Sequence, residues 1–190
     1  MPENKVTFGL KNVHIAPVKT IGADGVITYD EVFRFPGAMD LTLDPKGDSG
    51  AVKADDIDYH FINSNEGYDG KLKVTNIIEA FATKILGEIK DSQTGVMTEK
   101  GDSEPTAFAI MFEFSGDKNK TRHVLYYCSA SRPSNGSSTK NGTNVNEREL
   151  SFKASPRPLD SVIKRSITSA DNNEVYNKWF EKVYEPNSVG

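Results

Sequence analysis

The chain has 190 residues, a formal net charge of −4 and a pI of about 5.5, which favour one domain over residues 1–190 and argue against nucleic-acid binding through a basic face. The single cysteine, Cys128, excludes an intramolecular disulfide framework. No run approaches the roughly 18 apolar residues of a membrane span, and no apolar signal-peptide core opens the chain.

Alternating apolar residues predict strands in the first half of the chain. The apolar phase of the first strand slips at Lys11-Asn12, which predicts a bulge there. A stretch rich in Asp, Gly and Pro, Asp44–Gly50, is expected to form a polar turn or a long loop. The other expected features are strands over Lys5–Leu10, Val32–Leu43 (broken by Pro36-Gly37) and Lys71–Ile78, with turns at Ala23–Gly25 and Asn63–Gly67.

The strongest helix signal runs from Asn76 to Leu86. Ile78, Phe81, Ala82 and Ile85 recur at helical spacing, and Gly87 can serve as a left-handed cap. We therefore predict one helix that packs against the sheet.

Two strands, Thr106–Phe114 and Thr121–Ser129, form an expected hairpin that is apolar on both faces. A hairpin with one solvent-exposed face would carry a polar residue at every second position. A second sheet, a helix or a neighbouring copy must therefore cover each side, and the pattern points to a β protein that completes its core by assembly. The first strand has Phe108, Ile110, Phe112 and Phe114 on one face. The second strand has Val124, Tyr126 and Cys128 on one face and Leu125 and Tyr127 on the other.

The last third of the chain adds a polar loop over Ser131–Asn146, a strand and a short helix. In the strand, Glu147–Ala154, Leu150 and Phe152 are expected to point inward. Asp171–Glu174 reads as a capping box that opens the C-terminal helix. These elements predict a sheet-dominated α+β fold, mainly β, with one or two helices outside. The residues expected on the buried face of the C-terminal helix are Val175, Trp179 and Val183, with Tyr176 and Phe180 beside them.

Motifs that would indicate catalysis or a cofactor are weak. Gly47–Gly50 matches the tetrapeptide around a trypsin-like nucleophile, but only His14 precedes Ser49 and too little chain comes before it to build that fold. His14, His60 and His123 lack the close spacing of zinc ligands. The carboxylates between Asp44 and Asp58 do not follow a calcium-loop pattern. We therefore expect no enzyme, no metal and no cofactor.

Several short segments, taken together and in order, resemble one protein family, the major tail tube proteins of long non-contractile-tailed phages (siphophages) of Gram-positive hosts. No single segment is specific, but their joint order covers nearly the whole chain. The segments are Val6–His14, Phe35–Ala38, Leu41–Asp48, Asn63–Gly70, Phe112–Phe114, Thr121–Tyr126, Ala154–Pro158, Trp179-Phe180 and Tyr184–Pro186.

The resemblance implies a two-sheet β sandwich or split barrel with one flanking helix and a short C-terminal helix. It implies a virion structural protein, made in the host cytoplasm, whose hexameric rings stack into a hollow tube that conducts phage DNA during injection. The implied partners are further copies, the tape measure protein, the tail terminator, the distal tail or baseplate proteins, and double-stranded DNA passing without sequence-specific binding. No membrane is implied. The acidic balance agrees with a channel that repels phosphates.

Two sets of residues are candidates for assembly contacts and for channel or outer surfaces. The long polar run is expected to contact a neighbouring subunit or ring, and outward charges near the last long strand are expected to face the lumen or the outside. An alternative hypothesis is a carbohydrate- or surface-binding β sandwich that stacks ligands on Tyr126, Tyr127, Trp179 or Tyr184. The contact candidates are Asp44, Pro45, Lys46, Gly47, Asp48, Lys53, Asp55, Asp56 and Asp58, and the outward charges are Glu147, Glu149 and Lys153.

Overall fold

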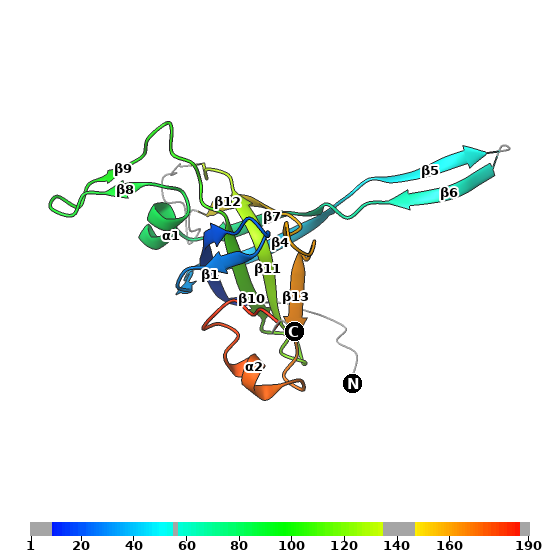
Figure 1. Ribbon diagram of the computed structural model, residues 1–190. Helices are drawn as coiled ribbons and strands as arrows, with labels where there is room; N and C mark the ends of the chain where they lie inside the picture. Colours follow the sequence, from blue (N-terminus) through cyan, green and yellow to red (C-terminus); the bar gives the residue numbers. More distant parts are fainter. Residues whose placement is uncertain (1–8, 55–56, 135–146, 187–190) are drawn as a thin grey trace, which may run out of the picture.

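The computed structural model consists of a curved sheet with two hairpins that project from it in different directions (Figure 1). It describes residues 9–54, 57–134 and 147–186, and over residues 49–63 it describes the backbone alone. Antiparallel strands and two short helices confirm the predicted mainly β, α+β fold. The strands of the main sheet are β1 (Leu10–Ile21), β2 (Ile27–Tyr29), β3 (Phe33–Arg34), β4 (Ala38–Lys46), β7 (Gly67–Val74), β10 (Phe108–Phe114), β11 (Arg122–Ala130), β12 (Arg148–Ala154) and β13 (Lys164–Ile167).

The main sheet follows the order β2-β1-β10-β11-β12-β7-β4 and does not close into a barrel. β3 adds to β1 beside β2, and β13 pairs with the first half of β11 while β12 pairs with its second half. The two ends of the sheet curl toward each other, so β4 comes close to β1 without a pairing between them. The predicted bulge in β1 is confirmed, because the register with β10 shifts between Lys11 and His14 and Asn12 has a φ of 53°. Residues 5–8 of the expected first strand lie outside the described residues.

The concave side of the curled sheet holds the larger core. Phe108, Ile110 and Phe112 of β10 are buried here, as the alternation predicted. Helix α1 (Glu79–Lys84) closes this core with Phe81 and the following Ile85, both fully buried. Further members of this core are Val13, Ile15, Phe35, Leu72, Val74, Leu125, Leu150 and Phe152.

Cys128 lies in this same core, and the prediction that placed it with Val124 and Tyr126 was wrong. Between the pairs Ile110–Leu125 and Phe108–Cys128, two steps along β10 correspond to three along β11. One extra residue on β11 makes a bulge, and a shift by one residue moves later side chains to the other face. Burial raises the pKa of the Cys128 thiol far above its usual range, so it packs as a small apolar group.

The convex face of β10 and β11 is covered by the C-terminal part of the same chain. We call residues 175–185 the C-terminal cover; it begins in helix α2 (Asn173–Asn177) and continues without regular structure. Trp179 and Val183 are buried against Met111, Val124 and Tyr126. Of the covers that the two-sided apolar pattern left open, a second sheet, a helix or a neighbouring copy, it is the chain itself that covers both faces of the hairpin.

Both helices are shorter than expected. Ile78 is extended and has no side-chain cap, so α1 begins three residues after Asn76. It also ends at Lys84, two residues before the expected Leu86, but the predicted left-handed Gly87 is confirmed by a φ of 76°, and the Glu88 amide donates to the Ala82 carbonyl. At α2 the cap is Asn172, whose Oδ1 accepts from the amides of Glu174 and Val175, whereas the Asp171 carboxylate accepts from Thr168. No helix among the described residues is long and apolar enough to span a membrane.

Candidate assembly surface

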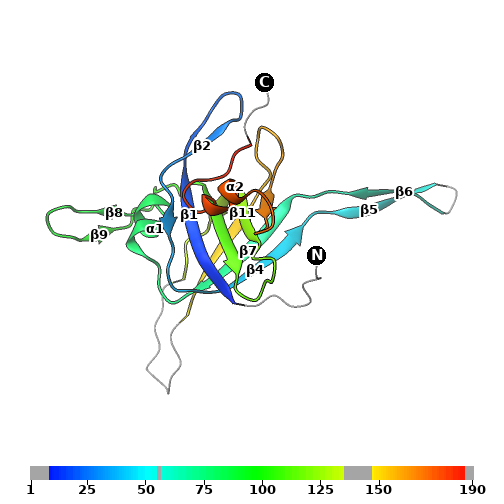
Figure 2. The same ribbon diagram turned by 90° about the horizontal axis from the view of Figure 1, so that it is seen from below.

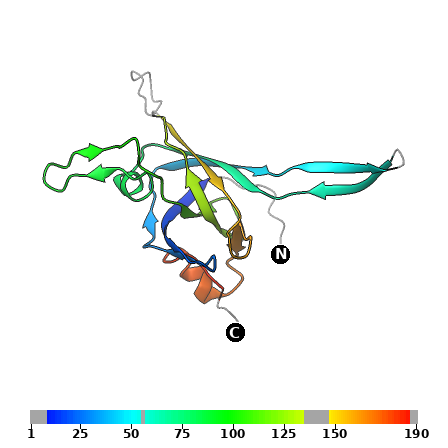
Figure 3. The same ribbon diagram turned by 45° about the horizontal axis from the view of Figure 1, so that its top comes forward.

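A long hairpin arm is the most prominent feature outside the sheet (Figures 1 and 3). It is built from strands β5 (Ser49–Ala54) and β6 (Ile57–Asn63), which continue β4 and β7 away from the body. These strands pair from Ser49–Asn63 to Ala54–Ile57. In all three overall views no other described element lies alongside the outer part of this arm, which leaves its two backbone edges accessible to another molecule.

The prediction of a loop over Asp44–Gly50 was wrong, since β4 runs to Lys46 and β5 starts at Ser49. The run Asp44–Gly50 is rich in Asp, Gly and Pro and has no apolar alternation of its own, which is the pattern that predicts a loop. The contact candidates are distributed along this hairpin. Asp44, Pro45 and Lys46 are exposed on β4, Gly47 and Asp48 link β4 to β5, Lys53 and Asp58 lie on the arm strands, and Asp55 and Asp56 lie outside the described residues.

The base of the arm is held by a close approach between its two strands. The Ser64 amide donates to the Asp48 carbonyl at 2.9 Å, and the Asp48 amide donates to the Ser64 hydroxyl at 2.8 Å. A Cβ on Gly47 would lie 2.0 Å from the Ser64 carbonyl oxygen. Only glycine fits there without a backbone shift, so Gly47 allows the arm to leave the sheet in this direction.

The outward face of β4, β7 and β12 is polar and carries charges of both signs. Leu150 and Phe152 point into the core as predicted, whereas Glu147, Glu149 and Lys153 are exposed. Across the strands, Glu149 is opposite Lys73 and Lys153 is opposite Asp69. Ion pairs join Lys73 to Glu147 at 4.0 Å and Lys46 to Asp69 at 3.3 Å. Whether this face lines a lumen or an outer surface stays a prediction.

Arg157 fastens the far end of the C-terminal cover. Its guanidinium is 6% exposed, pairs with Asp160 and with Glu185 at 2.5 Å each, and stacks 4.4 Å from the centre of the Tyr126 ring. Burial alone would lower the pKa of Arg157, but the hydrogen bonds that its guanidinium donates to the Asp160 and Glu185 carboxylates outweigh burial and raise the pKa. The Tyr126 hydroxyl in turn donates to the Tyr184 carbonyl at 2.7 Å. The sequence marked this arginine only as the end of a strand, so its anchoring role was missed.

Arg122 fastens the near end of the cover. Its guanidinium lies 3.9 Å from the centre of the Tyr176 ring, donates to the Tyr176 carbonyl and pairs with Glu113 at 3.2 Å. Glu113, although 6% exposed, also accepts from Asn12 at 2.7 Å and pairs with Lys11 at 3.4 Å. The buried Glu113 carboxylate is thus satisfied by Asn12, Lys11 and Arg122, as a buried ion must be, so it serves the fold and is not free for a ligand.

Most of the aromatic residues considered as stacking platforms for a ligand are buried or stacked against other side chains of this chain. Tyr126 is fully buried, Trp179 is 3% exposed, and Tyr184 stacks on Trp179 with ring centres 5.6 Å apart. Tyr127 is half-buried. The predicted packing of Trp179 against the sheet is confirmed, although it lies just beyond the end of α2. These positions give no support to the carbohydrate-binding alternative.

The residues considered for catalysis or metal binding do not converge. His14 stacks on Phe180 and His123 on Phe112, and burial lowers the pKa of both histidines. His60 and Ser49 lie on the two strands of the projecting arm. Within residues 9–54, 57–134 and 147–186, no three His, Cys, Asp or Glu side chains are grouped to hold a metal ion.

Comparisons with known proteins give fold likenesses only. No protein-family model and no curated protein matches the chain. It is similar to a chain of the anti-feeding prophage cap, the tube terminating cap, at 7% identity and a TM-score of 0.46, covering 83% of this chain and 89% of that one. It is also similar to a chain of the anti-feeding prophage baseplate at 9% identity and a TM-score of 0.40, covering 88% and 97%. Likeness of this extent does not carry function.

Proposed function

We propose that the protein is a structural, non-catalytic subunit of a phage tail tube, in which hexameric rings stack into a channel for DNA. The observation that carries the proposal is the arm: a paired hairpin that projects beyond the body, with no other described element alongside its outer part. An isolated two-stranded hairpin is marginally stable in water, so a surface of another molecule would stabilise it. A stacked assembly of identical copies supplies such a surface at every subunit.

The remaining features agree with this proposal. The resemblance to tail tube proteins extends over segments from Val6 to Pro186 and includes the start of the arm, Leu41–Asp48. The outward face of β4, β7 and β12 presents charges and hydroxyls, as a surface in contact with water or passing DNA requires. The two prophage chains share a fold likeness, but the proposal does not depend on them.

The arm can be removed without cutting the body. Lys46 and Gly67 form the last β4–β7 pair, so an Asn-Gly turn can join them directly in place of residues 47–66. A matched control shortens the second projecting hairpin, formed by β8 (Ile89–Lys90) and β9 (Met97–Thr98), where Asn-Gly replaces residues 91–96 between the paired Lys90 and Met97. Both variants should keep the far-ultraviolet circular dichroism of a β protein.

The armless variant should fail to form stacked tubes in negative-stain images, while wild type and the control assemble. Tubes of normal length from the armless variant would show that the arm has no role in stacking. Assembly lost equally in both variants would assign no special role to the arm.

A further inference from the structure

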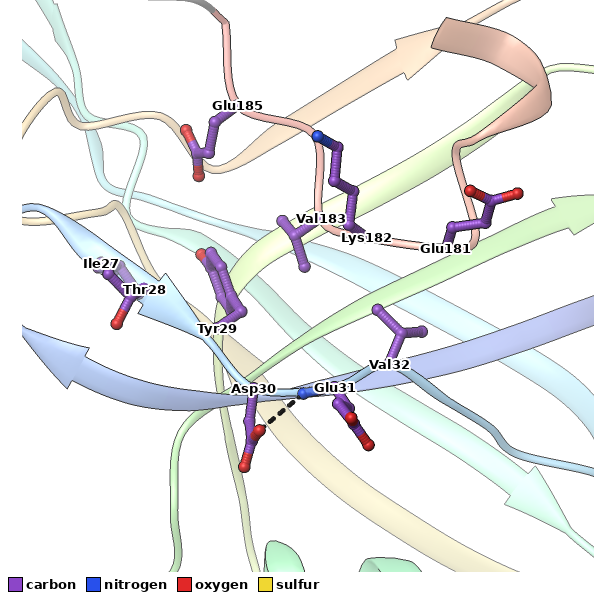
Figure 4. Close-up of a pocket in the computed structure, with 10 residues that line it drawn as sticks. All are labelled: Ile27, Thr28, Tyr29, Asp30, Glu31, Val32, Glu181, Lys182, Val183 and Glu185. Carbon is purple, nitrogen blue, oxygen red and sulfur yellow. Dashed lines mark hydrogen bonds between the residues drawn. The ribbon is translucent and has the colours of Figure 1, made fainter. Parts of the chain in front are cut away.

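A groove opens between β2 and the C-terminal cover (Figure 4). It has a volume of about 410 Å³ and is lined by the consecutive residues 27–32 on one side and by Glu181, Lys182, Val183 and Glu185 on the other. In the described part of the chain β2 pairs only with β1, so its other edge faces this groove. Val32 and Val183 give it an apolar floor beside Tyr29.

The lining of this groove carries a net negative charge, with four carboxylates against one lysine. Asp30, Glu31 and Glu181 form no ion pair with any described lysine or arginine, and Lys182 is the one cation of the lining. Glu185 is already paired with Arg157. A cationic element that brings an apolar stem fits such a groove, because lysine side chains lay their methylenes on apolar surface while the ammonium group meets carboxylates.

The chain carries such an element in the turn between β10 and β11. The buried Asp117 carboxylate accepts from the amides of Asn119 and Thr121 at 2.8 Å each, and the Lys120 amide donates to the Asp117 carbonyl at 3.1 Å. Lys118 and Lys120 are exposed on this braced turn, and neither forms an ion pair with the described residues. The two ammonium groups are therefore displayed on a backbone that is already ordered.

The turn and the groove lie at different levels of the sheet. Leu10 of β1 pairs with Phe114, just before the turn, whereas the groove lies beside Pro17 and Val18, since the Asp30 amide donates to the Pro17 carbonyl and Tyr29 pairs with Val18. Eight residues of strand separate the two levels, about 26 Å at about 3.3 Å per residue. The β2 side of the groove is therefore out of reach of the turn of the same copy.

We propose that the Lys118–Lys120 turn of one copy binds the acidic groove of the next copy. The contact is heterologous, with two different patches of one chain meeting head to tail, and such contacts build rings or filaments. Exposed ion pairs contribute little each, so this contact sets direction and register while other surfaces supply most of the buried area. The inference rests on the self-assembly in the proposed function and deepens it by naming one pair of complementary surfaces.

A charge exchange tests this pairing. One variant carries Lys118→Glu with Lys120→Glu, and the other carries Glu31→Lys with Glu181→Lys; all four side chains are exposed, so the fold should persist. A control carries Lys100→Glu with Asp102→Lys on the exposed loop after the second hairpin. Sedimentation velocity at low salt should show each variant alone associating at least about tenfold more weakly than wild type and the control.

Mixing the two variants is the decisive part of the experiment. The acidic turn of the first then meets the basic groove of the second, and the basic turn of the second meets the intact groove of the first, so association should return. Unaffected association in either variant, or no recovery on mixing, would overturn the pairing while leaving a tube subunit possible. A wild-type chain that stays monomeric at every concentration would overturn both the pairing and the proposed function.

Discussion

Replacing Trp179 by alanine tests whether the C-terminal cover shields the convex face of the sheet in solution. Trp179 is 3% exposed, packs against Met111 and Val124, and stacks on Tyr184. Its indole also donates to the His123 carbonyl at 3.4 Å. Truncating a buried tryptophan costs about 3–5 kcal/mol through lost apolar contacts and the cavity left behind. That is a large part of the roughly 5–15 kcal/mol by which domains are stable.

The free energy of unfolding should be measured by urea titration under conditions that keep the protein monomeric. Circular dichroism is the suitable signal, because Trp179 is the single tryptophan and its removal abolishes tryptophan fluorescence. The midpoint of thermal unfolding should fall by roughly 6–20 °C, at about 2–4 °C per kcal/mol for a chain of this size. Leu159→Ala, at a side chain that is 54% exposed, should change stability by no more than about 0.5 kcal/mol. A loss below about 1 kcal/mol for Trp179→Ala would refute the cover.

Three further predictions concern backbone fit and pH. Gly70→Ala should lose about 1–3 kcal/mol of unfolding free energy, because a Cβ there would lie 2.3 Å from the buried Phe152 ring; Gly101→Ala, with open space around it, should change little in the same urea titration. Gly47→Ala should shift the arm and impair tube formation in negative-stain images without lowering the thermal midpoint of the body as strongly as Gly70→Ala does. Burial lowers the pKa of His14 and His123 below 6.5, so on acidification the unfolded chain takes up protons before the folded chain does, and the free energy of unfolding should fall as pH drops through and below 6.5. A His14→Asn, His123→Asn variant should show a flatter dependence of unfolding free energy on pH in urea titrations from pH 7.5 to 5.5. An equally steep dependence would contradict the assignment to these histidines.

Apolar periodicity predicted the elements that face the core. The two faces of β10, the inward Leu150 and Phe152, and the apolar positions around Phe81 follow from side-chain alternation and helical spacing. The sequence did not predict which segment covers the second face of the β10–β11 hairpin, because an apolar pattern shows that a face must be covered but not what covers it. Trp179 lies more than fifty residues from His123, and only the fold brings them together.

The candidate assembly surface was harder to predict from the sequence, because it consists of segments that do not pack against the core. The run from Asp44 to Gly50 is rich in Asp, Gly and Pro and lacks apolar alternation, so its sequence predicted a loop. The single-residue bulge that turns Cys128 inward leaves no mark in composition. The groove joins β2 to the C-terminal cover, two segments about 150 residues apart, and its acidic character emerges only when Glu31 and Glu181 are brought to opposite sides of one groove.

The most direct measurement is light-scattering mass combined with negative-stain microscopy of the purified wild-type chain over a concentration series. A tail tube subunit should give masses in steps of six protomers and rings or tubes with a central hole. Particles of one protomer, without a hole, at every concentration would contradict the central claim.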